Sequence, residues 1–195
     1  TRNMYPGLKG AGFSFDGFDD SITFPHTEAL NFYSPKLTSF AVSLWQKRSN
    51  TGAASYSLMK MADTVNWTQS SYQLLHYGAG NLIFATKAYN VNAAVGETST
   101  NWVHVCGVFG RVSGTRELYT NGILAASETS GDSDPVYNVA NVIIGYLSGY
   151  AYGGMLCDVG IFSNAPMTAT EVSNFWWNIG GKYTNQPWMS NENGY

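Results

Sequence analysis

The chain has 195 residues, of which 15% are aromatic and 12% are charged, and its net charge is −3. A chain of this length folds by default as one domain and buries about 70% of the surface that its unfolded form would expose. The low, slightly negative charge argues against nucleic acid and anionic membrane surfaces as partners, because both attract basic proteins. No apolar run approaches the roughly 18 residues that a membrane span needs, so we expect no membrane span.

Short stretches of alternating apolar and polar residues follow one another along the chain. Gly, Asn, Ser or Pro separate most of them, and no helical pattern intervenes. Many short strands of this kind predict an all-β fold in which two antiparallel sheets bury one face each against the other. The predicted strands are residues 12–15, 21–24, 40–45, 57–60, 72–75, 81–84, 102–105, 116–121, 123–127, 142–144 and 155–162.

The segment ELYTNGIL, residues 117–124, predicts a hairpin around Asn121-Gly122. A two-residue turn that matches the twist of its strands needs φ > 0 at both central positions, which Asn and Gly tolerate. Side chains alternate along a strand, so we expect Leu118 and Thr120 on one face of the sheet and Tyr119 on the other.

One segment near the end of the chain has helical spacing. Thr168-Ala169-Thr170-Glu171 is a capping box, and Gly180-Gly181 ends the pattern. We expect one short helix of about three turns whose apolar side packs on the edge of the sandwich, because an isolated helix of ~11 residues is marginal in water. Residues 1–181 then form the sandwich domain, and residues 182–195 form a strap or tail.

The sequence lacks the common catalytic patterns. The Glu-x-Asp-x-x-Glu strand of retaining β-sandwich glucanases is absent, as is the Gly-x-Ser-x-Gly nucleophile elbow. The three histidines are far apart and show no paired ligand spacing, so we interpret them as core or surface residues. The sequence predicts a non-catalytic protein, with a glycoside hydrolase as a distant alternative.

Three carboxylates fall within five residues in Asp16-Gly17-Phe18-Asp19-Asp20. Such density repels itself unless the carboxylates are solvated or bind a cation such as Ca²⁺. An exposed turn and a structural calcium site are both open. For the calcium site, Asp16 and Asp19 are candidate ligands, and Asp158 is the expected distant ligand because a carboxylate on an apolar strand needs a compensating group.

Tyrosines gather in the Gly-rich segment GYLSGYAYGG, residues 145–154. Tyr and Trp rings stack on the apolar faces of sugars and leave a polar group free for hydrogen bonding. Tyr146, Tyr150 and Tyr152 are therefore candidate ligand-binding residues, and Trp67 and Tyr72 are candidates for a second rim. The alternative for each is a ring that covers a strand end.

Six segments form an ordered set: FSFDGFDDSITFP (13–25), SFAVSLWQKRS (39–49), NWVHVCGVF (101–109), RELYTNGILAAS (116–127), VIIG (142–145) and GGMLCDVGIFSNAPMTATEV (153–172). This set resembles the concanavalin A-like lectin/glucanase superfamily, in particular its laminin G-like and pentraxin-like jelly rolls. The resemblance implies a jelly-roll β-sandwich with one short C-terminal helix.

Two departures from the pentraxin pattern affect function. The cysteine that would bridge Cys106 falls on Ser43, so this disulfide is not expected and Cys106 is interpreted as a small buried residue. Residues 145–150 replace the calcium-binding Glu-Gln-Asp run of pentraxins, so their double-calcium site is not implied.

We therefore expect a binding module that recognises carbohydrate through aromatic loop residues, as part of a larger surface-displayed or extracellular assembly. Its partners would be a glycan or glycoprotein and neighbouring subunits, and its cofactor a structural Ca²⁺. The alternative is a structural, decoration or receptor-binding component at the surface of a phage or viral particle.

Overall fold

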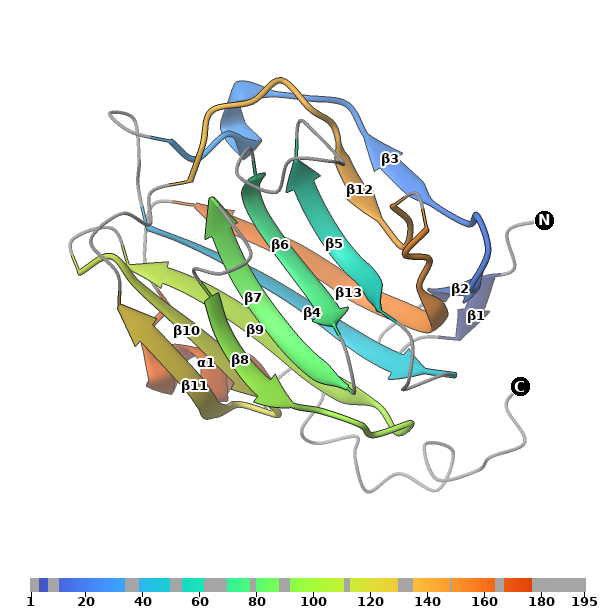
Figure 1. Cartoon of the computed structure of the whole chain (residues 1–195). Helices are drawn as coiled ribbons and strands as arrows, with labels where there is room; N and C mark the ends of the chain where they lie inside the picture. Colours follow the sequence, from blue (N-terminus) through green and yellow to red (C-terminus); the bar gives the residue numbers. More distant parts are fainter. Residues whose placement is uncertain are drawn as a thin grey trace.

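The computed structural model of the chain describes residues 4–6, 11–33, 39–49, 54–61, 70–77, 80–87, 92–110, 113–129, 135–147, 149–163 and 167–176. These residues form two antiparallel sheets stacked face to face, with one short α-helix on the outside (Figure 1). The predicted all-β jelly-roll sandwich is confirmed.

The seven-stranded sheet lies at the back in Figure 1, and every neighbouring pair in it is antiparallel. In spatial order its strands are β1 (Met4–Pro6), β2 (Ala11–Asp16), β13 (Gly153–Ser163), β4 (Phe40–Arg48), β9 (Val103–Gly110), β10 (Thr115–Thr120) and β11 (Ile123–Thr129).

The six-stranded sheet lies in front and is also antiparallel throughout. A short 3₁₀ helix, η1 (Glu28–Leu30), follows its first strand. In spatial order its strands are β3 (Ile22–Phe24), β12 (Val142–Ile144), β5 (Ser55–Met61), β6 (Ser70–Tyr77), β7 (Asn81–Lys87) and β8 (Asn92–Gly96).

All the predicted strands are present, and the structure adds β1 and β8 to them. The sequence MYP of β1 contains a proline, which cannot donate a hydrogen bond to a sheet, so it gives a weak strand signal. The sequence NAAVG of β8 lacks the alternation that marks a half-buried strand. Both strands lie at sheet edges, where pairing with one neighbour suffices.

The core between the sheets is built around aromatic rings. The centroid of the Phe40 ring lies 4.4 Å from that of Phe32, 5.5 Å from that of Phe109 and 6.3 Å from that of Phe84. Phe40 comes from the seven-stranded sheet and Phe84 from the six-stranded sheet, so their contact joins the two layers. Each large apolar side chain that is fully buried contributes about 1.5–3 kcal/mol to folding.

Three cationic side chains, Arg48, Lys60 and Arg116, are buried among the described residues, and the partners of two of them are as follows. Arg116 donates a hydrogen bond to the Glu128 carboxylate and another, of 3.2 Å, to Thr86 Oγ1. Lys60 contacts His26 Nδ1 at 3.2 Å and donates to the Ala140 carbonyl. Burial lowers the pKa of Lys60 to about 8. Lys60 and Arg116 therefore have internal partners that offset part of the cost of leaving water.

The hairpin between β10 and β11 has the predicted turn. Asn121 has φ 50° and Gly122 has φ 77°, as a type I′ turn requires. Asn121 Oδ1 also accepts a hydrogen bond of 3.0 Å from the His104 backbone N–H, which ties the turn to β9. Leu118 belongs to the core between the sheets and Tyr119 packs on the outer face, so their predicted separation is confirmed.

Helix α1 (Ala169–Trp176) begins at the predicted capping box. The Thr168 backbone N–H donates to Glu171 Oε2 at 2.7 Å, and the Glu171 N–H donates to Thr168 Oγ1 at 3.2 Å. The helix packs on the outer face of the seven-stranded sheet, where Val172 joins Ala41, Cys106, Val108 and Tyr119. The expected position at the edge of the sandwich holds in part, because α1 contacts the edge strand β11 while its apolar side packs on the outer face of the sheet. Residues 177–181 and the predicted tail, 182–195, lie outside the described residues.

Cys106 and Cys157 are both buried and neither forms a disulfide, as expected for Cys106. Strand β4 lies between the strands that carry them, with Ser43 opposite Cys106 and Trp45 opposite Cys157. Two strand spacings of about 4.8 Å already exceed the reach of a disulfide.

Two buried histidines confirm the core interpretation. His76 Nε2 lies 2.9 Å from Gln46 Nε2, and Ser57 Oγ donates to Gln46 Oε1 at 3.1 Å. His104 Nε2 lies 2.8 Å from Ser43 Oγ. Burial lowers the pKa of His104 to about 4, and burial together with the nearby Arg48 charge lowers the pKa of His76 to about 3. Both imidazoles are therefore neutral in the native protein at neutral pH.

We expect Gly122→Val to destabilise the fold by roughly 1–3 kcal/mol, because a β-branched residue is strained at φ 77°. A side chain there would also press on Trp176, whose ring lies 3.1 Å from the position of the added Cβ. Chemical denaturation measures the change. The control Ile123→Val, at an exposed neighbouring position, should stay within about 0.5 kcal/mol of wild type. Equal stability of the two variants would contradict the strained turn.

The free energy of unfolding should fall as the pH drops from 7 toward 4. Below pH 6.5, the ordinary pKa of histidine, both side chains become protonated in the unfolded chain. In the native protein His76 and His104 stay neutral to lower pH because their pKa values are lowered. Each histidine then removes up to about 1.4 kcal/mol of stability per pH unit. His104→Gln should flatten this pH dependence in urea titrations, whereas Ser43→Ala, which keeps the imidazole, should not. An unchanged slope in His104→Gln would contradict the assignment.

Candidate functional site at one end of the sandwich

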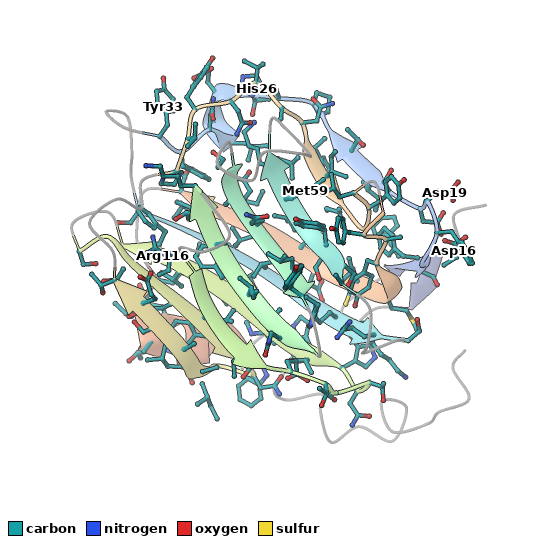
Figure 2. All side chains as sticks on the ribbon, viewed as in Figure 1. Asp16, Asp19, His26, Tyr33, Met59 and Arg116 are labelled. Atoms are coloured by element: carbon teal, nitrogen blue, oxygen red, sulfur yellow. The ribbon has the colours of Figure 1, made fainter. Side chains whose placement is uncertain are left out.

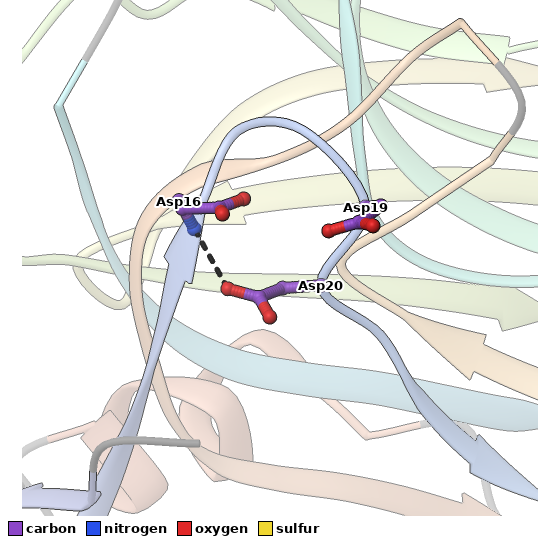
Figure 3. A group of neighbouring side chains, drawn as sticks. All are labelled: Asp16, Asp19 and Asp20. Carbon is purple, nitrogen blue, oxygen red and sulfur yellow. Dashed lines mark hydrogen bonds between the residues drawn. The ribbon is translucent and has the colours of Figure 1, made fainter. Parts of the chain in front are cut away.

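The acidic turn, residues 16–20, joins β2 to β3 at one end of the sandwich (Figure 3). The Phe18 N–H donates to Asp16 Oδ1 at 2.8 Å, and the Asp16 N–H donates to Asp20 Oδ2 at 3.0 Å. Gly17 supplies the φ of 86° that closes the turn. Phe18 projects from the tip with 80% of its surface exposed.

Asp16, Asp19 and Asp20 bring their carboxylates together on this turn. One oxygen from each lies within 4.8 Å of the others, and Asp16 and Asp19 are exposed. Calcium binds carboxylate oxygens at about 2.3–2.6 Å, so oxygens on opposite sides of one ion are separated by about 5 Å. The spacing is compatible with Ca²⁺, and it is also that of three solvated carboxylates.

Asp158 is not part of this group, which corrects the sequence-based expectation. The register of β13 and β2 places Gly153 opposite Asp16, so Asp158 lies five residues further along the strand. At about 3.3 Å per residue this is roughly 16 Å away. Asp158 is exposed on a bulge of β13, where its backbone has φ 50°. Asp20 supplies the third carboxylate of the group instead.

A cavity of about 300 Å³, here called the rim cavity, opens beside the acidic turn. A second cavity of about 340 Å³ shares Asp16 and Ser49 with it and adds Lys47 and Arg48. The rim cavity therefore combines an exposed aromatic ring with hydroxyls, a carboxylate and glycine backbone. Its lining residues are Asp16, Gly17, Phe18, Ser49, Ser55, Ala151 and Gly153.

The loop 145–152 runs from β12 to β13 on the other side of this cavity. The Gly145 N–H donates to the Ser57 carbonyl at 3.3 Å, and the Tyr56 N–H donates to the Tyr150 carbonyl at 3.3 Å. These bonds hold the loop against the start of β5. Gly145 has φ 92°, and a Cβ there would lie 2.2 Å from the Phe15 ring, so the close approach requires glycine.

Tyr146 and Tyr150 are half-buried on this loop. The Tyr150 ring packs edge-on against Tyr56 at a centroid distance of 6.0 Å. Burial, followed by the nearby Tyr150 and Tyr77, raises the pKa of Tyr56, so its hydroxyl stays protonated. Tyr77 is 42% exposed and was missed by the sequence interpretation, because it ends a strand rather than lying in a Gly-rich loop.

Tyr152 and Tyr72 are core residues and present no ring to a ligand. Both have 0% of their surface exposed. Tyr152 packs edge-on against Phe15 at 6.0 Å, and Tyr72 lies 5.5 Å from Phe40 within the layer between the sheets. The expectation that they stand at a rim is therefore wrong. Trp67 lies outside the described residues.

Phe18, Ser49 and Ser55 line the rim cavity but were not predicted as site residues. Phe18 had a usable signal, since an aromatic residue between aspartates in a turn has no core to enter. The two serines had none, because the connection from β4 to β5 meets the acidic turn only in the folded sandwich.

The described residues do not present a catalytic arrangement of acids or a nucleophile. The strands of the six-stranded sheet contain no Asp or Glu. Glycoside hydrolysis needs two carboxyls that flank the sugar bond. Ser43 and His104 resemble a nucleophile and base in spacing, but both have 0% of their surface exposed, which denies access to a substrate.

The described part of the chain contains no helix with the length and apolar character that crossing a membrane requires. Curated proteins yield no significant sequence match.

Solved structures share the fold at low sequence identity. The binding domain of Paraclostridial Mosquitocidal Protein 1 is 15% identical with a TM-score of 0.68, over 91% of this chain and 45% of that one. This chain thus spans about half the length of that domain. Domain 4 of AbnA, an extracellular GH43 arabinanase from Geobacillus stearothermophilus, was solved with arabinotriose. It is 17% identical with a TM-score of 0.66, over 89% of this chain and 80% of that one.

A native heptameric SAP-like pentraxin from Limulus polyphemus is 19% identical with a TM-score of 0.53, over 78% of this chain and 79% of that one. Such identities show a common fold and no more. The sequence itself matches a family model from residue 16 to residue 173. The chain therefore belongs to the Laminin_G_3 family of the concanavalin A-like lectin/glucanases superfamily.

Proposed function

We propose that this chain is a non-catalytic module that binds carbohydrate at the end of the sandwich where the acidic turn and the loop 145–152 meet. The observation that carries the proposal is the rim cavity. It sets the exposed Phe18 ring beside the Ser49 and Ser55 hydroxyls and the Asp16 carboxylate. An aromatic ring stacks on the C–H face of a sugar, while hydroxyls and carboxylates hydrogen-bond its OH groups.

Neighbouring aromatic residues extend this surface. Tyr150 and Tyr77 both lie close to Tyr56, since both help to raise the pKa of the Tyr56 hydroxyl. Tyr150 is joined through Ala151 to the rim cavity. We assign Phe18 the main stacking role, and we assign Tyr150, Tyr146 and Tyr77 supporting contacts with a longer glycan.

The similar structures support a binding role. One of them is the binding domain of Paraclostridial Mosquitocidal Protein 1, and domain 4 of the arabinanase was solved with arabinotriose. The arrangement of acids in the described residues gives no support to glycoside hydrolysis. Specificity for carbohydrate, as opposed to another receptor, rests on the rim cavity and is the part that needs testing.

The proposed setting is outside the cell, as part of a surface-displayed assembly. The alternative of a decoration or receptor-binding component of a phage or viral particle stays a prediction. Light scattering after size exclusion tests assembly, and a strictly monomeric species at high concentration would count against it.

The binding test is a glycan array that includes arabinotriose, followed by calorimetry on the glycan retained. We expect Phe18→Ala to weaken affinity about five- to thirtyfold, which corresponds to roughly 1–2 kcal/mol for a stacked ring. The control Ile123→Ala removes an exposed apolar side chain from the β10–β11 hairpin and should bind as wild type. An array that stays silent, with and without calcium, would remove the proposal.

Calcium binding by the acidic turn stays a prediction with its own test. If Ca²⁺ binds the native turn alone, saturating it at 100 times Kd should stabilise the fold by about 2.7 kcal/mol and raise the melting temperature. Asp19→Asn should abolish this shift, and the control Asp158→Asn should keep it, since Asp158 lies outside the group. A melting temperature that does not respond to Ca²⁺ or EDTA identifies the turn as solvated carboxylates.

A further inference from the structure

A different cavity, of about 420 Å³, lies on the outer face of the seven-stranded sheet between the β10–β11 hairpin and the start of α1. We call it the hairpin cavity. Figure 2 shows the labelled Asp16 and Asp19 at one end of the sandwich, across the molecule from Arg116 on β10. The order of strands in the sheet puts β13, β4 and β9 between β2 and β10, so this cavity is separate from the rim cavity.

The register of the sheet explains which side chains line the hairpin cavity. Glu117 stands opposite Val108, and Tyr119 stands opposite Leu124, so all four side chains lie on one face. Met167 and Thr168, which precede the helix, close the other side. The complete lining is Ser39, Val108, Gly110, Ser113, Thr115, Glu117, Tyr119, Leu124, Met167, Thr168 and Ala169.

Glu117 is the one charged residue in this lining, and it has no cationic partner among the described residues. Its described hydrogen bond comes from the Tyr119 hydroxyl, which donates to Oε2 at 2.6 Å. Burial and this contact raise the pKa of Tyr119, so the hydroxyl remains a donor. The adjacent Arg116 points to the opposite face, where it binds Glu128 and Thr86. Among the described residues, the cavity therefore carries one negative charge with no cation beside it.

We infer that the hairpin cavity binds a primary alkylammonium group. The ammonium would hydrogen-bond to Glu117, with its charge close to the Tyr119 ring, and the alkyl chain would lie against Val108, Leu124 and Met167. A carboxylate hydrogen bond and an aromatic ring both favour a cation over a neutral group. An anion would be repelled by Glu117, and a neutral apolar ligand would leave the carboxylate without a counter-charge.

The test is an NMR titration of the ¹⁵N-labelled chain with hexylammonium, with hexanol as the neutral ligand of similar shape. We expect saturable shifts at the backbone amides of Thr115, Glu117 and Leu124, with hexanol at least tenfold weaker. Hexanol that binds as well as hexylammonium, or shifts confined to other parts of the sheet, would overturn the inference.

Variants separate the charge from the shape of the cavity. Glu117→Gln keeps the size of the side chain and should weaken hexylammonium at least tenfold, without changing the weaker binding of hexanol. Asp19→Asn makes the same change in net charge far from the cavity and should bind as wild type. Equal affinity of Glu117→Gln and wild type would overturn the inference, and the hexanol shifts show that the variant keeps its fold.

Two sources of an alkylammonium are distinguished by a second ligand, N-acetyl-lysine methylamide. If it binds at least as tightly as hexylammonium, the cavity suits a lysine side chain of a protein partner. If it binds more than tenfold more weakly, the cavity suits a free amine. Both results require that Glu117→Gln reduces the affinity.

Discussion

The fold depends on the apolar layer that the two sheets share. Phe40 contacts Phe84 across this layer, and its other ring neighbours, Phe32, Phe109 and Tyr72, complete an aromatic centre. Successive side chains along a strand point to opposite faces of the sheet, so the neighbours of each inward-pointing residue point outward. What the outer faces and the ends of the strands can do is set by this alternation, because the interior is filled and excludes substrate.

Polar groups within the sandwich follow from the same constraint. Gln46, Ser57 and His76 hydrogen-bond one another, and Arg116 binds Glu128. Such groups cost free energy to bury unless they find partners in the folded chain. They stabilise one arrangement of the sheets, and the two buried histidines make that arrangement sensitive to acid. Chemistry open to a ligand is therefore left to the sandwich end and to the outer face.

The two candidate binding regions arise from different features of the jelly roll. The rim cavity forms where the acidic turn, the start of β5 and the loop 145–152 converge at the ends of strands from both sheets. The hairpin cavity forms where α1 covers only part of the outer face of β9 to β11. One region offers a ring with hydroxyls and carboxylates, and the other offers a single carboxylate in an apolar setting. Their chemistry suits different ligands.

The sequence by itself determined all the described strands except β1 and β8, together with the Asn121-Gly122 turn, the capping box of α1 and the family resemblance, because each is a local pattern of backbone preference or alternation. It also placed Asp16 and Asp19 on one turn, since they are neighbours in the chain. Only the tertiary structure decided that Tyr152 and Tyr72 are buried, that Asp158 is distant from the acidic turn, and that Ser49 and Ser55 meet Phe18. These facts depend on the register between strands and on the face of the sheet that each residue occupies. The sequence pattern around a tyrosine does not show whether its ring points into the core or toward solvent.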